Sequence, residues 1–446
     1  MLALSHVHTW NNLLCYNNHR RPYAHPSIIT INTPIDQGSH HQHSSAPFTT
    51  ISPQVRNTAI MNAPASFISL PPELVTKICR DSDLEKKDLI ALRSTSKTQG
   101  IHASATKEYG ERKFTNLRIL FTHYSLQSFV DICKHPDFGP CVRRVQLSNV
   151  HADLRGIEFL VAHETHNLRS TDPQVIKSSA AKVQSCLDRY YEEIALEESG
   201  EGQKLLESAF MFLAQYGHPL SLAIDNDESS SIGHQKLFID ENIYSGWLWM
   251  PHTKIRAPLL ISSAARQRCE ISEIEIKPQE FDRFRTNGDD GDSICFSGIE
   301  EELHAIGPRL KKLDLTLTAY TDAQSVKSIE LILTEATHLK EFRLVCEPFD
   351  LRQSFLSGIL RAVTSRSLVT VAICCGHNLP TTLIGMLTKS KLSIESLVWT
   401  GDHNGLRTIR DELSDWVAQN LTELQDLRFC EKGCCVSPRA FHWYIS

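Results

Sequence analysis

The densest group of potential metal ligands lies near the carboxyl end of this 446-residue chain. Cys430, Cys434, Cys435 and His442 offer the thiolate and imidazole groups that zinc prefers. Zinc sites commonly take cysteines in pairs separated by two residues, and no such pair occurs in the sequence. Two adjacent cysteines are poorly placed around a tetrahedral ion, so we expect buried thiols here rather than a metal centre.

Three weaker groups of ligands fail for similar reasons. The histidines of residues 163–166 are three positions apart, whereas a zinc-binding helix needs them four apart. The aspartates of residues 289–292 lack the alternating ligands and the final Glu of a calcium loop, which favours a solvated turn. The histidines of residues 40–43 belong to a polar tract. We predict no metal and no cofactor.

Motifs for catalysis are missing as well. The chain has no Gly-x-Ser-x-Gly elbow, no phosphate-binding loop and no dinucleotide glycine triplet. We therefore predict that it is not an enzyme. A hydrolase whose residues meet only in the folded chain is the third alternative, and activity screening of the purified protein tests it.

Composition narrows the class further. The sequence is 41% hydrophobic and 22% charged, as in ordinary globular proteins, and its net charge of −6 argues against a general nucleic-acid binder. No apolar run reaches the roughly 20 residues that a membrane helix needs. The 13 cysteines are scattered, which indicates reduced thiols and a cytoplasmic or nuclear location.

A short segment before residue 100 predicts two small helices. Prolines after Leu70 can open a helix but not continue one, and a polar break at residues 80–83 ends it. Asp88 is then placed to cap a second helix. Helices this short cannot seal a core, so their apolar side chains need a partner. These side chains are Leu74, Val75, Ile78, Leu89 and Leu92.

The same segment reads Leu-Pro-x-Glu-Leu followed by Asp-Leu-x-x-Leu-Arg-x-x-Ser-Lys. From Phe67 to Phe114 it resembles an F-box, the helical module that docks on the Skp adaptor of Skp–cullin ubiquitin ligases. The alternative is that these apolar residues only pack against the rest of the chain. The resemblance implies that the adaptor-binding residues are Leu70, Pro71, Leu74, Val75, Ile78, Leu89 and Leu92.

A repeat occupies the carboxyl-terminal half. The pattern apolar-x-x-apolar-x-apolar recurs with its middle residue at 313, 342, 371, 397 and 427, and each interval holds a helical pattern. Sparser copies occur at 142–147 and 271–276. A strand and a helix at this period resemble a degenerate leucine-rich-repeat solenoid, in which units stack because none closes its own core.

The predicted fold class is α/β, with a short helical F-box module before an irregular βα solenoid. The expected domains are a disordered extension at 1–60, the F-box-like module at 61–116 and the solenoid at 117–446. The solenoid contains a helical hairpin insertion at 173–217.

The resemblance implies a substrate-recognition adapter for ubiquitin-dependent degradation, joined through the Skp adaptor to cullin. The alternative is a repeat scaffold that acts outside any ligase. Outward-facing residues of the repeats carry mixed charge, which favours a protein substrate, with neither nucleic acid nor membrane as a partner. The predicted substrate-binding residues are Lys312, Asp314, Lys340, Glu341, Arg343, Glu395, Asp426 and Arg428.

Overall fold

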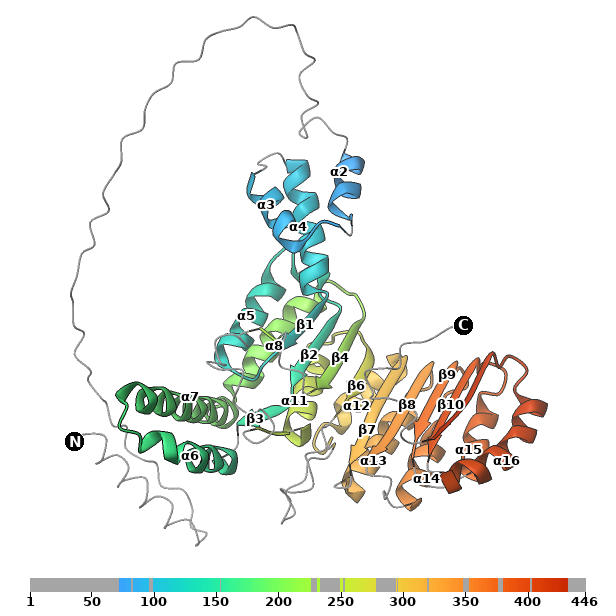
Figure 1. Cartoon of the computed structure of the whole chain (residues 1–446). Coiled ribbons are helices and arrows are strands. Elements are labelled where there is room, and N and C mark those ends of the chain that lie inside the picture. Colours follow the sequence, from blue (N-terminus) through green and yellow to red (C-terminus); the bar gives the residue numbers. More distant parts are fainter. Residues whose placement is uncertain are drawn as a thin grey trace, which may run out of the picture. The chain divides into compact units, whose positions relative to one another are not determined.

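The computed structural model describes most of the chain beyond residue 71 (Figure 1). Contacts divide the chain into Met1–Ala63 and Pro64–Ser446, and every described element belongs to the second unit. The extension predicted at 1–60 lies outside the described residues. These are 72–81, 83–95, 99–152, 154–225, 231–232, 249–251, 253–277, 294, 296–318, 321–347, 353–375, 380–401 and 403–431.

One nine-stranded sheet organises the described part of the unit. Its strands stand side by side in chain order, and every pairing between neighbours is parallel. This confirms the α/β class and is compatible with a repeating strand–helix solenoid. The strands are β1 (Asn116–Ile119), β2 (Arg144–Ser148), β4 (Leu220–Asp225), β6 (Ile271–Ile276), β7 (Lys312–Thr318), β8 (Glu341–Glu347), β9 (Thr370–Cys374), β10 (Ser396–Gly401) and β11 (Asp426–Glu431).

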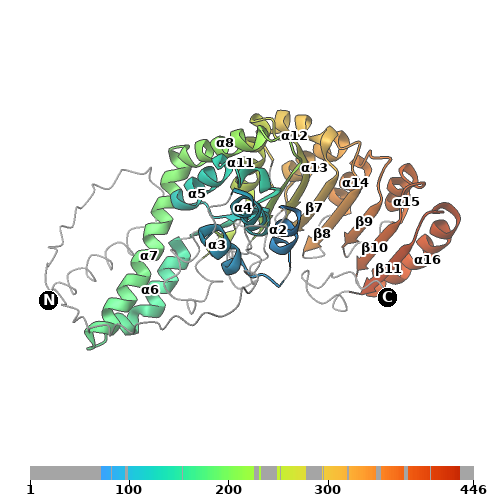
Figure 2. The same cartoon turned by 90° about the horizontal axis from the view of Figure 1, so that it is seen from above.

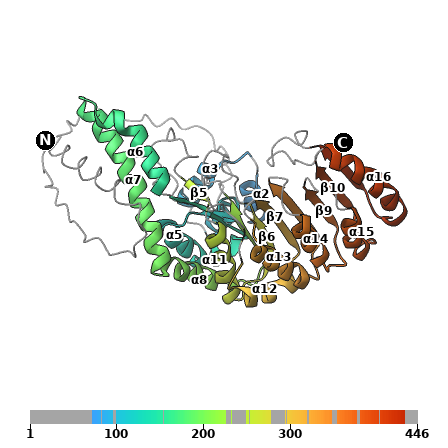
Figure 3. The ribbon, with the colours of Figure 1, turned by 90° about the horizontal axis from the view of Figure 1, so that it is seen from below.

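Helices connect the strands, as parallel pairing requires. Figure 2 and Figure 3, from above and below, show these helices along one side of the sheet and the strands along the other. The connecting helices are α5 (His123–Lys134), α8 (Glu201–Ala214), α11 (Thr253–Arg266), α12 (Glu300–Ile306), α13 (Ala323–Glu335), α14 (Gln353–Ala362), α15 (Pro380–Lys389) and α16 (His403–Asn420).

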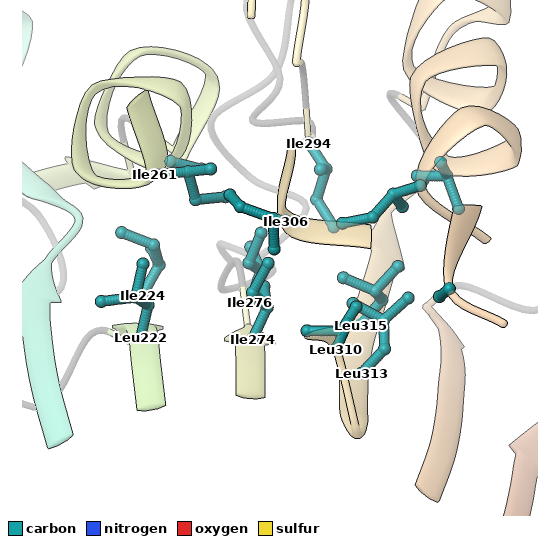
Figure 4. Close-up of a cluster of buried hydrophobic side chains, with 14 of the residues drawn as sticks. Leu222, Ile224, Ile261, Ile274, Ile276, Ile294, Ile306, Leu310, Leu313 and Leu315 are labelled. Atoms are coloured by element: carbon teal, nitrogen blue, oxygen red, sulfur yellow. The ribbon is translucent and has the colours of Figure 1, made fainter. Parts of the chain in front are cut away.

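The core lies between the sheet and these helices. Alternate strand residues point to the helix side, and eight register partners from β1 to β10 are at most 2% exposed. Burying each such side chain contributes roughly 1.5–3 kcal/mol. Figure 4 shows Ile274 and Leu313 on the same side of the sheet as Ile261 of α11. The eight are Leu117, Val145, Leu222, Ile274, Leu313, Phe342, Val371 and Leu397.

The interval predicted as a hairpin holds two helices, and each packs more extensively against another helix than against its neighbour in sequence. α7 (Pro173–Glu198) packs mainly against α6 (Leu154–Leu168), whereas α8 packs against α5 on the sheet. Gly202 allows α8 to pack closely against Phe121, because a Cβ at this position would lie 2.3 Å from the Phe121 ring. The remaining short elements are β3 (Val150–Ala152), β5 (Trp249–Pro251), η2 (Gly139–Cys141) and η3 (Gly307–Arg309).

Within the described residues, three helices precede the sheet and have a small core of their own. In this helical module, α2 (Pro72–Cys79) and α3 (Lys86–Thr95) both pack against α4 (Gln99–Phe114), which runs directly into β1. The buried residues of this core are Val75, Cys79, Leu89, Ile101 and Ala105.

Asp88 stabilises the start of α3, although not as the cap itself. Its carboxylate accepts a hydrogen bond from the backbone N–H of Glu85 at 2.9 Å, while the Asp88 N–H donates to the Glu85 carbonyl. Asp88 therefore supplies the reciprocal half of a capping box from the third helical position.

Candidate functional site

The helical module buries one side of α2 and exposes the other. Val75 and Cys79, four residues apart, point into the core, whereas Leu74 is 47% exposed. Adjacent helical residues point about 100° apart, and α4 covers Val75 while Leu74 remains exposed. Ile78 is half-buried at the border. Val75 therefore belongs to the core of the module, whereas Leu74 is exposed to solvent.

On α3 the predicted residues divide in the same way. Leu89 is fully buried in the core, so Leu89 and Val75 are corrected from adaptor contacts to core residues. Leu92 is half-buried, and Ile90, which the sequence motif did not single out, is 45% exposed. Leu92 also packs against the module core, so it reaches the surface only in part. We call Leu74, Ile78, Ile90 and Leu92 the module surface residues. Leu70 and Pro71 lie outside the described residues.

Two arginines hold the module together and join it to the sheet. Arg112 of α4 donates to the carbonyls of Cys79, Asp81 and Leu84, which satisfies acceptors at and beyond the end of α2.

Arg93 of α3 lies over two aromatic rings. Its guanidinium carbon is 5.0 Å from the Tyr109 ring centroid and 5.3 Å from that of Phe138, next to η2. The rings of Phe114 and Phe138 are 4.7 Å apart. Together they connect α3 and α4 to the first strand–helix unit through cation–π and ring contacts. The sequence motif includes Arg93 but assigned it no contact, and it did not single out Arg112.

The sheet face away from the helices carries mostly polar side chains, in rows that follow the strand register. We call it the polar face. The first row is Arg144, Ser221, Glu273, Lys312, Glu341, Thr370, Ser396 and Asp426. The second row is Gln146, Ala223, Glu275, Asp314, Arg343, Ala372, Val398 and Arg428.

Six of the predicted substrate residues lie in these rows and form pairs. Lys312 Nζ is 3.2 Å from a Glu341 carboxylate oxygen, and Arg343 is 3.6 Å from Asp314. The third pair joins Arg428 Nε to Asp426 Oδ1 at 2.8 Å.

Lys340 and Glu395 lie elsewhere. Each is exposed and immediately precedes its strand, so each falls outside the two rows. They are at the amino-terminal end of β8 and near that of β10, and the structure does not bring them together with the paired charges.

The polar face also contains charges that the prediction missed. Arg144 Nη2 of β2 is 2.8 Å from Glu275 of β6, and Lys277 contacts Glu275 and lies 3.5 Å from Asp314. Arg144 and Glu275 occupy alternate positions of the two sparser repeat copies, and Lys277 directly follows the second copy, so the same alternation could have found them. The charges therefore link β2, β6, β7 and β8 in one network, since Asp314 is also paired with Arg343.

Two neighbouring carboxyls of this network have opposite pKa shifts. Burial by itself would raise the pKa of Glu275, but Arg144 and Lys277 outweigh it and hold that pKa at about 2. Burial also raises the pKa of Asp314, and there the cations Arg343 and Lys277 do not overcome it. Asp314 Oδ1 accepts no hydrogen bond among the described residues.

A second charge cluster is buried beneath α7. Arg256 of α11 is fully buried, with its guanidinium 2.7 Å from Glu197 and 3.8 Å from Glu193. Arg189 Nε is 2.7 Å from Glu193, and the Phe121 ring lies 3.5 Å from the Arg256 guanidinium carbon. Because each charge has an opposite partner, this cluster fastens α7 to the sheet layer rather than offering a reactive group.

The metal-ligand candidates acquire other roles or lie outside the described residues. Glu164 of α6 is buried and accepts hydrogen bonds from Asn167 and from Ser179 of α7, both at 2.7 Å. Burial by itself would raise the pKa of Glu164, but the two hydrogen bonds and the nearby cations outweigh burial and lower that pKa. Residues 40–43, 289–292, and 434–442 are not described. Within the described ranges, no group of three or more His, Cys, Asp and Glu side chains could hold a metal ion.

Comparison with known proteins identifies no family for this chain. No family model matches the chain, and no curated protein matches it. Among the helices of the described residues, none is both long enough and apolar enough to cross a membrane.

Proposed function

We propose that this chain is the substrate-recognition subunit of a Skp–cullin–F-box ubiquitin ligase. The observation that carries the proposal is a module of three described helices that has a small core of its own, exposes aliphatic side chains and lies directly before a strand–helix array. The module has the sequence order of an F-box, and the array resembles a degenerate leucine-rich-repeat solenoid.

The module surface residues are the proposed contacts with the Skp adaptor, joined by Leu70 and Pro71 from the sequence motif. Leu74 on α2 and Ile90 on α3 each leave nearly half of a large aliphatic side chain in water. A few such residues commonly dominate a protein interface, and burying each would contribute roughly 1.5–3 kcal/mol. Val75 and Leu89 act indirectly, because they hold α2 and α3 against α4.

The polar face is the proposed site for a protein substrate. Its charges are of mixed sign and are largely paired with each other. A surface of mixed sign favours a partner with complementary mixed charge over the uniform negative charge of nucleic acid. Ubiquitin transfer would take place on other subunits, and this chain would act by raising the local concentration of substrate lysines.

Binding to a purified Skp adaptor tests the first contact. We expect Leu74→Lys and Ile90→Lys each to weaken the complex at least tenfold, because each places a charge in an apolar interface. Lys77→Ala, at an exposed position of α2, is the matched control and should bind as wild type does.

Leu74 and Ile90 are both largely exposed, so each Lys variant should keep the thermal unfolding midpoint of wild type. Equal adaptor affinity for wild type and both Lys variants would refute the docking assignment. Adaptor binding without cullin in the same assembly would instead favour the scaffold that acts outside a ligase.

A further inference from the structure

The segments that lead into three neighbouring strands carry exposed cations, which we call the basic rim. Arg309 and Lys311 precede β7, Lys340 precedes β8, and Arg366 lies between α14 and β9. All four residues are exposed. Within the described part of the chain, none of the four side chains forms an ion pair or donates a hydrogen bond.

Hydrogen bonds between neighbouring segments fix the backbone that carries these cations. The backbone N–H of Lys340 donates to the Lys311 carbonyl at 2.8 Å, and that of Val369 donates to the Lys340 carbonyl at 2.7 Å. The buried Ser365 hydroxyl donates to the Leu339 carbonyl at 2.7 Å. Neighbouring parallel strands lie roughly 4.8 Å apart, so the basic rim spans about 10 Å from β7 to β9.

The arrangement of these charges is unfavourable for the chain alone. Lys311 and Lys340 continue the register of Lys312 and Glu341 by one residue, so two like charges stand side by side on neighbouring strands. Glu341 does not offset them, because its carboxylate is paired with Lys312 at 3.2 Å. A bound anion would relieve this repulsion.

Cations near the end of a helix often serve only to satisfy its last carbonyl groups. Lys389, at the end of α15, has this role, since its Nζ donates to the carbonyls of Arg361 and Val363 at 2.9 and 2.7 Å. The cations of the basic rim make no such bond within the described residues. Capping therefore does not account for them.

We propose that the basic rim binds a short acidic segment of a protein partner. Its charge is uniformly positive although the chain has a net charge of −6. The sign becomes mixed on both sides, because Arg268 and Glu270 precede β6, and Lys391 and Glu395 precede β10. The span of about 10 Å matches roughly three residues of extended peptide. A nucleic-acid strand would instead carry its phosphates onward past Glu270 or Glu395.

The basic rim is separate from the polar face, since Lys340 falls outside the two rows of that face. It gives a role to a residue that the sequence singled out and that the charge pairs of the sheet do not include. The proposal does not depend on the adaptor or on the proposed ligase function.

Fluorescence anisotropy with the full chain and a labelled oligoglutamate peptide tests the proposal. Wild type should bind the peptide, and the affinity should fall as the salt concentration rises. Lys340→Glu should weaken binding about tenfold or more, because it removes a cation and repels the peptide. Lys327→Glu, at an exposed position of α13, changes the net charge equally but lies away from the rim, so it should bind as wild type does.

Two further variants separate charge recognition from a folding defect. Lys340→Arg should retain binding, whereas Lys340→Gln should weaken it and keep or raise the thermal unfolding midpoint, since it removes the repulsion with Lys311. Absence of peptide binding by wild type at low salt overturns the proposal. So do equal effects of Lys340→Glu and Lys327→Glu, or tighter binding of a labelled single-stranded oligonucleotide than of oligoglutamate.

Discussion

Replacing Glu275 by Gln should destabilise the fold strongly although the residue lies on the polar face. The pKa of Glu275 falls from its ordinary 4.5 to about 2 in the folded chain. At about 1.4 kcal/mol for each pKa unit, that difference corresponds to about 3 kcal/mol in the free energy of unfolding. Arg144 and Lys277 remain partly in water, so the substitution leaves no fully buried cation.

The pH dependence has a definite sign. Because the folded-state pKa lies below the unfolded one, the contribution of Glu275 is complete above about pH 4.5 and is lost as the pH falls toward 2. The difference between wild type and Glu275→Gln should therefore shrink below half of its neutral value by about pH 3. Urea unfolding followed by circular dichroism at several pH values measures it.

Asp314→Asn is the matched comparison, since Asp314 is the register partner of Glu275 on the next strand. Its pKa is raised by burial, so the folded chain disfavours the carboxylate near neutral pH. Asp314→Asn should therefore have the opposite effect and leave the free energy of unfolding at pH 7 unchanged or higher. If Asp314→Asn destabilises as much as Glu275→Gln, the electrostatic account of the polar face is refuted.

Three further substitutions test other parts of the fold by urea unfolding. Arg256→Met should lower the free energy of unfolding by about 3 kcal/mol, because it leaves Glu193 buried beside fewer cations. An unchanged free energy would contradict the claim that the buried charge cluster fastens α7 to the sheet layer. Leu89→Ala should cost about 2–5 kcal/mol in the helical module and reduce adaptor binding through unfolding; stability equal to wild type would place Leu89 outside the core. Gly202→Ala should lower the free energy of unfolding by about 1–3 kcal/mol, because the added methyl group would clash with the Phe121 ring. An unchanged free energy would contradict the close packing of α8 against Phe121.

The sequence pattern was sufficient to predict the α/β class. Middle residues such as Leu313, Phe342 and Leu397 recur at nearly constant spacing, and the structure places them in one register row. Strand alternation then placed Asp314 and Arg343 on the other face correctly.

Local sequence patterns could not predict contacts between residues that are far apart in the chain. Arg144 and Glu275 are 131 residues apart in sequence, and their pairing follows only from the strand order. The helices α7 and α8 both have apolar stripes, and periodicity does not say which neighbour each stripe meets. Leu74 and Val75 are adjacent and both apolar, so only the position of α4 decides that Val75 is buried.

Affinity purification of the full chain with quantitative mass spectrometry tests the central proposal most directly. The account predicts that wild type recovers the Skp adaptor and cullin in comparable amounts. It also predicts that Leu74→Lys loses both while remaining as abundant and as stable as wild type. Recovery of neither protein with wild type, or equal recovery with the variant, would contradict it.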